Sequence, residues 1–145
     1  MALKRMDNVG IVVEDLDATV AFFQELGLEL EGRATIEGEW AGRVTGLGDQ
    51  HVEIAMMRTP DGHGRLELTR FDHPSAQRGE VENAPNLLGL RSVMFQVDDV
   101  DATVAALRPH GAELVGEVAR YEDVYRLAYL RGPAGIIVSL AQELG

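Results

Sequence analysis

The chain has 145 residues, a formal net charge of −11 and no cysteine. This length can bury one sizeable core, so we expect one compact domain. The acidic surplus argues against binding nucleic acid or an anionic membrane through bulk electrostatics. The lack of cysteine excludes disulfides, thiolate metal ligands and a cysteine nucleophile.

The first 15 residues reach acidic side chains too early for a secretory signal peptide. No apolar run approaches the ~20 residues that a membrane span needs. We therefore expect a cytoplasmic protein.

A stretch near the N-terminus occurs twice. The segment VEDLDATVA (13–21) returns as VDDVDATVA (97–105), and GLELEG (27–32) returns as GAELVG (111–116). Pairing residues 8–32 with 92–116 gives 12 identities in 25, where unrelated segments would match at roughly one or two positions. The sequence therefore predicts an internal duplication, with a strand running into a helix in each copy.

The first copy predicts a βαβββ module. Apolar residues alternate in 5–13 and then recur at helical spacing, with Asp15 at the N-cap position. Gly32 is expected at a bulge or bend of the next strand, and Trp40 in a short helical turn within a glycine-rich insert. The expected elements are a strand at 5–13, a helix at 15–26, and strands at 28–36, 51–58 and 65–71, with a turn at 59–64.

The second copy repeats this order after a polar connection. The expected elements are a strand at 91–97, a helix at 99–108 starting from Asp99, and strands at 112–118, 125–131 and 136–141, with a turn at 132–135. The domain organisation is thus a first module (1–71), a connection (72–89) and a second module (90–145). We expect an α+β fold whose modules form a curved, cup-shaped mixed sheet with the helices on its outer face.

Strand parity predicts which side chains face away from the helices. Leu66 and Leu68, like Val138 and Leu140, form the apolar pair that packs under the helix. The residues between them, and polar residues of the first strand of each module, then face the concave side. These predicted concave-face residues are Asn8, Glu67, Ser92 and Ser139.

The duplicated D-x-D-A at each helix start, the G-x-E-L that follows, and the E-L or S-L of the closing strands resemble the vicinal oxygen chelate superfamily. This superfamily includes glyoxalase I, bleomycin resistance proteins, extradiol dioxygenases and methylmalonyl-CoA epimerase. The resemblance covers nearly the whole chain. It implies the fold more strongly than any one chemistry.

The resemblance also implies ligand positions. Metal-using members hold a divalent ion with His or Gln of the first strand and Glu of the last strand in each module. The matching positions here are Asn8, Glu67, Ser92 and Ser139, and only Glu67 has the expected ligand type. Because a site for Zn²⁺, Ni²⁺, Mn²⁺ or Fe²⁺ usually needs three or more His, carboxylate or thiolate ligands, we expect no cofactor, with a divalent metal as the less favoured alternative.

The four histidines do not complete such a site. The direction of the His51 side chain stays open, but one histidine together with Glu67 would be too few ligands. Solvated side chains are the better explanation for His63, His73 and His110. Glu67 has two interpretations that stay open: a general acid or base whose pKa burial would raise, or a carboxylate satisfied by its polar neighbours. Trp40 is the aromatic residue that we favour as a pocket residue.

The function predicted from the sequence is binding of a small organic ligand in the concave cup without a metal. The alternative is a glyoxalase-like lyase, isomerase or dioxygenase that uses Glu67 or a non-standard metal site. A scaffold without a ligand is the third possibility. We expect a homodimer, because exposed sheet edges need covering.

Overall fold

The computed structural model describes residues 2–79 and 83–145. The chain divides into two compact units, unit 1 (Met1–Arg78) and unit 2 (Gly79–Gly145), and the division lies within the polar connection 72–89. Each unit is a mixed α+β structure with its own sheet. Within the described residues, no helix is long and apolar enough to cross a membrane.

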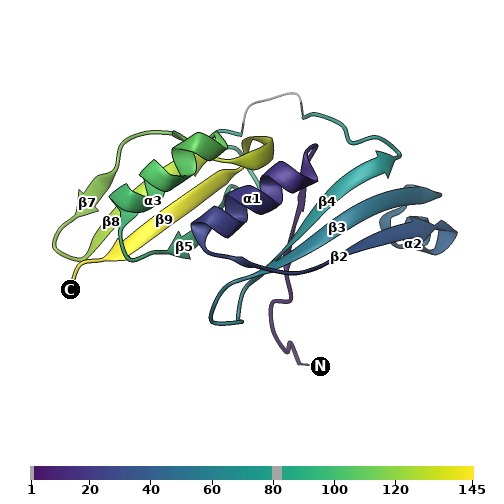
Figure 1. The fold of residues 1–145 in the computed structure, drawn as a ribbon, viewed down its shortest axis with the longest axis horizontal. Helices are drawn as coiled ribbons and strands as arrows, with labels where there is room; N and C mark the ends of the chain where they lie inside the picture. Colours follow the sequence, from purple (N-terminus) through teal and green to yellow (C-terminus); the bar gives the residue numbers. More distant parts are fainter. Residues whose placement is uncertain (1, 80–82) are drawn as a thin grey trace. The chain divides into compact units, whose positions relative to one another are not determined.

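Unit 1 has the predicted βαβββ order with one added short helix. Its strands form a sheet in the order β1-β4-β3-β2, in which β1 is parallel to β4 and the other pairs are antiparallel (Figure 1). The elements are β1 (Val9–Val12), α1 (Leu16–Leu26), β2 (Glu29–Gly38), α2 (Glu39–Thr45), β3 (Gln50–Arg58) and β4 (Arg65–His73).

Three details of unit 1 can be compared with the prediction. The first strand is shorter than 5–13, because its partner β4 begins only at Arg65 and gives residues 5–7 no strand to pair with. The predicted irregularity at Gly32 is confirmed, since the β2–β3 register shifts between Leu30 and Gly32. Trp40 lies in α2, as the expected short helical turn.

Unit 2 repeats the order on a smaller scale. Its sheet has the order β5-β9-β8-β6, and β7 also pairs with β8 (Figure 1). The elements are β5 (Ser92–Gln96), α3 (Val100–Leu107), η1 (Arg108–His110), β6 (Glu113–Leu114), β7 (Ala119–Tyr121), β8 (Tyr125–Arg131), η2 (Pro133–Gly135) and β9 (Ile137–Glu143).

The predicted strand 112–118 is wrong as one element. Leu114 pairs with Leu130, whereas Ala119 pairs with Leu127. The segment thus advances by five residues while its partner strand β8 advances by only three. The extra residues leave the ladder between β6 and β7. Gly116 lies between β6 and β7, and glycine is a residue that commonly interrupts a strand because it has no side chain to pack.

The repeated helix starts share one capping structure. Asp15 Oδ1 accepts a hydrogen bond from the Ala18 backbone N–H at 2.9 Å, and Asp99 Oδ1 accepts one from Ala102 at 3.0 Å. Gly27 ends α1 with a φ of 123°, a conformation that favours glycine. The duplication therefore preserves both the sequence and the physical start signal of each helix.

Burial agrees with the predicted parity of the closing strand in unit 1, where Leu66 and Leu68 are buried together with Phe23 of α1 and Glu67 between them is half-buried. In unit 2, α3 lies along β8 and β9 (Figure 1). Burial does not distinguish the two faces of β9, because all residues from Ile137 to Ala141 are buried. The open side of a sheet is therefore seen in unit 1, on the face opposite α1.

Candidate functional site

The candidate site of unit 1 is the side of the sheet opposite α1, which we call the open face. Its centre is a row of three residues on neighbouring strands: Gly10 pairs with Glu67, which pairs with Met56. Glu67 is half-buried, and its carboxylate forms no hydrogen bond or ion pair with any residue of 2–79 or 83–145. The open face therefore has an uncompensated carboxylate at its centre.

Gly10 leaves space beside this carboxylate. A Cβ atom added at Gly10 would meet no heavy atom within 4 Å. The φ of Gly10 is not among the positive values, so the backbone does not demand glycine here. Space on this side of Glu67 therefore depends on the absence of a side chain at residue 10.

Apolar side chains flank the row on one side. Ile54 pairs with Thr69 one step further along the same face, and Val12 lies beside Thr69 on β1. Val12 is 48% exposed, and Ile54 and Met56 are half-buried. An apolar molecule on this face would cover these side chains and gain hydrophobic stabilisation.

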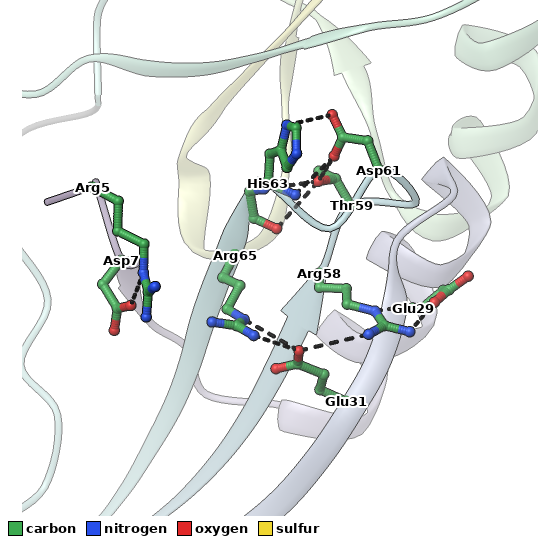
Figure 2. Close-up of polar contacts among 10 residues, drawn as sticks. Arg5, Asp7, Glu29, Glu31, Arg58, Thr59, Asp61, His63 and Arg65 are labelled. Atoms are coloured by element: carbon green, nitrogen blue, oxygen red, sulfur yellow. Dashed lines mark hydrogen bonds and ion pairs between the residues drawn. The ribbon is translucent and has the colours of Figure 1, made fainter.

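The nearest arginines on the open face are already paired. Arg65 donates to Glu31 Oε1 at 2.9 Å and 3.2 Å, and Arg58 donates to Glu29 Oε2 at 2.8 Å and 3.2 Å. Figure 2 shows that Glu31 lies between the two guanidinium groups, with Arg58 Nη1 at 4.0 Å. The hydrogen bond to Glu29 raises the pKa of Arg58 above its ordinary value.

This Arg58–Arg65 network is closed and neutral. Its two cations are matched by the carboxylates of Glu29 and Glu31, and the bulge after Leu30 brings Glu31 to this position. Arg65 is two residues before Glu67 on the same face of β4, yet its guanidinium points to Glu31. The network therefore does not neutralise the Glu67 carboxylate.

The matching row of unit 2 is built differently. Met94 pairs with Ser139, which pairs with Tyr129. Ser139 has no exposed surface, and its Oγ has no hydrogen-bond partner among the described residues. Met94 occupies the position of Gly10 at the offset of 84 residues that relates the two copies. Unit 2 thus has a side chain where unit 1 has space, and a hydroxyl where unit 1 has a carboxylate.

The other two polar site residues lie near these rows. Asn8 is half-buried and comes immediately before β1, on the same side as Gly10 by strand parity. Ser92 is half-buried at the start of β5 and pairs with Ile137, on the same side as Ser139. Asn8 and Glu67 thus share a face in unit 1, and Ser92 and Ser139 share a face in unit 2.

Trp40 lies at a distance from Glu67 within unit 1. It is 54% exposed, and its Cδ1 lies 3.6 Å from the position of a Cβ added at Gly38. Gly38 pairs with Gln50, six residues along β3 from Met56, a separation of about 20 Å at the rise of a strand. Trp40 and Glu67 are therefore too far apart to contact one small molecule together.

The turn between β3 and β4 is organised by Asp61, as the predicted Pro-Asp-Gly signal requires. Asp61 Oδ1 accepts hydrogen bonds from Thr59 Oγ1 at 2.6 Å and from the His63 backbone N–H at 3.0 Å (Figure 2). These bonds, with the Thr59 hydroxyl first, lower the pKa of Asp61. His63 is exposed beside Asp61, so a structural turn explains both residues.

Sequence comparison decides the family. The sequence pattern of the Glyoxalase/Bleomycin resistance protein/Dioxygenase superfamily matches residues 5–140. The chain belongs to this superfamily. A crystal structure of a glyoxalase family protein from Bacillus cereus is 60% identical to it, with a TM-score of 0.95, and the match covers 100% of this chain and 97% of that one.

More distant relatives cover the whole chain as well. The uncharacterized protein YaeR of Escherichia coli is 27% identical over 99% of each chain. The crystal structure of TnmS3, an antibiotic binding protein from Streptomyces sp. CB03234, has 20% identity and a TM-score of 0.62, covering 99% of this chain and 98% of that one. The likeness to TnmS3 shows the superfamily's fold.

The residues present do not fit the metal site that the superfamily fold implies. The four positions supply one carboxylate, from Glu67, together with an amide and two hydroxyls. Across the described parts of the chain, no three His, Asp or Glu side chains gather closely enough to hold a metal ion. This includes the row of Glu37, His51 and His73, which the strand register brings together and sequence reasoning missed.

Sequence reasoning also missed the part played by Gly10 and Met94. The signal was present, because these two residues occupy the same position in the aligned copies. Their opposite sizes distinguish the space beside Glu67 from its counterpart beside Ser139. A comparison of the two copies at each position, rather than of their shared residues, would have found this difference.

Proposed function

We propose that this superfamily member binds a small organic ligand without a metal, on the open face of unit 1 around Glu67. The observation that carries the proposal is the half-buried Glu67 carboxylate, which has no partner among the described residues and lies beside apolar side chains, with space above Gly10. Ligand sites in proteins combine such apolar walls with a few polar groups that orient the ligand.

Ligand chemistry supports the metal-independent part of this proposal. Asn and Ser oxygens are neutral and weak ligands for transition metals, and a tight site usually needs three or more His, carboxylate or thiolate groups. Asn8, Ser92 and Ser139 provide none of these. One carboxylate is well suited, in contrast, to accept hydrogen bonds from an organic molecule.

The antibiotic binding protein TnmS3 provides a fold-level precedent. TnmS3 binds an antibiotic, which is an organic ligand, and its fold is similar to that of this chain. A shared fold does not transfer the ligand. It supports the narrower point that this fold accommodates a small organic molecule.

Metal analysis of protein purified without chelator tests the proposal. We expect far less than one divalent ion per chain by inductively coupled plasma mass spectrometry, in wild type and in Glu67→Gln alike. A stoichiometric ion that Glu67→Gln loses would contradict metal independence and locate the ion at the open face. Loss in Glu37→Gln instead would contradict it too, and would locate the ion at the Glu37, His51 and His73 row.

A catalytic function is the second candidate, and the same residue favours it. A carboxylate without a fixed partner is free to exchange a proton with a bound molecule, as a lyase or isomerase of this superfamily would require. Glu67→Gln keeps the size of the side chain and removes its proton exchange. Turnover of a substrate by wild type that is lost in Glu67→Gln, with substrate affinity retained, would establish catalysis.

We propose further that the protein is a cytoplasmic homodimer. The strand β2 lies at the edge of the unit 1 sheet, and eight of its ten residues are exposed. Long exposed edge strands are commonly covered by another chain. Light scattering at micromolar concentration should give the mass of two chains, whereas a monomeric mass would contradict the dimer.

A further inference from the structure

We infer that the ligand of the open face is an organic cation, with an apolar body on Val12, Ile54 and Met56 and a protonated amine paired with Glu67. This inference rests on the proposed function, and it specifies the chemical class of the ligand. Three independent features of unit 1 carry it: the charge balance of the face, the burial of Glu67 and the glycine at residue 10.

Among the described residues, no cationic side chain is paired with the Glu67 carboxylate. Arg58 and Arg65 are arginines of β3 and β4 on this face, and Glu29 and Glu31 already neutralise them at 2.8–2.9 Å. Arg5, in the segment before β1, is paired with Asp7 at 3.3 Å (Figure 2). A ligand with a negative charge would meet Glu67 without a protein cation to offset the repulsion. A ligand with a positive charge would offset the Glu67 carboxylate, which the closed Arg58–Arg65 network does not neutralise.

The partial burial of Glu67 strengthens the attraction to a cation. A charged hydrogen bond between an ammonium and a carboxylate is stronger than a neutral one, and exclusion of water by an apolar ligand body strengthens it further. The body would lie over Met56 and Ile54, which are half-buried in the free protein. Affinity would then come from apolar burial, and selectivity from the charge.

Gly10 lowers the stability of strand β1, and a ligand that fills the space beside it would account for the presence of glycine. Glycine within a strand is destabilising relative to alanine, because it loses more conformational freedom and packs no side chain. Nothing in the local structure requires it, since an added Cβ meets no atom within 4 Å and the φ is not positive. Unit 2 tolerates Met94 at the same position of its own first strand. We therefore assign the space above Gly10 to the ligand's amine-bearing end.

Three probes that share one apolar body test the inference. These are 1-naphthylmethylamine, 1-naphthylmethanol and 1-naphthoate, which are cationic, neutral and anionic near neutral pH. Each is titrated calorimetrically into wild type, Glu67→Gln, Gly10→Met and the control Glu37→Gln, in buffer with EDTA. Glu37 is an exposed carboxylate on the edge strand β2, away from the Glu67 row.

The expected order of affinity for wild type is amine, then alcohol, then carboxylate. Glu67→Gln should weaken the amine roughly tenfold or more, as expected for loss of a charge-assisted hydrogen bond, and leave the alcohol within about twofold. Gly10→Met should weaken amine and alcohol together, because it fills the space, while thermal unfolding shows an intact fold. Glu37→Gln should bind all three probes as wild type does.

Other results would overturn the inference and separate its failure from that of the proposed function. Equal affinity of amine and alcohol in wild type and Glu67→Gln would refute the cation, yet leave metal-independent binding standing. Binding that requires a divalent ion in place of EDTA would refute the proposed function itself. An absence of saturable binding by all three probes would overturn both.

Discussion

Replacing Ser139 by alanine should stabilise the protein, which is unusual for a change in a buried strand. Its Oγ is completely buried and has no partner among the described residues. An unsatisfied buried hydroxyl costs about 1–3 kcal/mol of desolvation, which Ser139→Ala would relieve. The lost packing of one oxygen offsets part of this gain. We therefore expect a net increase of about 1 kcal/mol in the free energy of unfolding.

Urea and thermal denaturation measure this effect. For a protein of this size, 1 kcal/mol corresponds to a rise in Tm of roughly 2–4 °C. Ser92→Ala is the matched control, because Ser92 is half-buried on the same face of the unit 2 sheet. It should change stability by less than about 0.5 kcal/mol. If Ser139→Ala instead lost about 1 kcal/mol or more of unfolding free energy, the Ser139 hydroxyl would have to be hydrogen-bonded, and the prediction would be wrong.

Three further predictions concern the fold. Gly42→Ala should lower stability by about 1–3 kcal/mol or more in urea unfolding, because its Cβ would lie 1.4 Å from the Gly48 carbonyl oxygen; a neutral effect would contradict the close approach. Asp99→Ala should cost about 1 kcal/mol by the same assay, through loss of the N-cap bond of α3, and Asp99→Asn should restore most of it. Arg126 lowers the pKa of Asp101 below its ordinary 3.8, chiefly through their hydrogen bond. The stability that this pair contributes is therefore present above pH 3.8 and is lost as the pH falls through the lowered pKa. Asp101→Asn should lower the free energy of unfolding at pH 7 and leave it unchanged in strong acid. An NMR titration of Asp101 that finds no lowered pKa would contradict this.

The features set by periodicity were predictable from the sequence. Alternation at Leu66 and Leu68 identified the face of β4 that packs under α1, and the repeated Asp15 and Asp99 located both helix starts. These signals are local, because the period of a strand or helix and a capping side chain act within a few residues. The superfamily followed from the same repeated segments.

Features that depend on pairing between distant residues were not predictable. The split of β6 from β7 follows from a register with β8, and the length of β1 follows from where β4 begins. Parity assigned Ser139 to the face away from α3 but could not reveal that the side chain is fully buried. The pairing of Arg65 with Glu31 depends on a bulge across the sheet, so the isolation of Glu67 became visible only in the structure.

A crystal structure with 1-naphthylmethylamine, grown in EDTA, tests most directly whether Glu67 holds an organic cation. We predict that the amine nitrogen lies about 2.7–2.9 Å from a Glu67 carboxylate oxygen, in the space above Gly10, with the naphthyl ring over Met56. A metal ion coordinated by Glu67, or the amine bound elsewhere with Glu67 facing solvent, would contradict it.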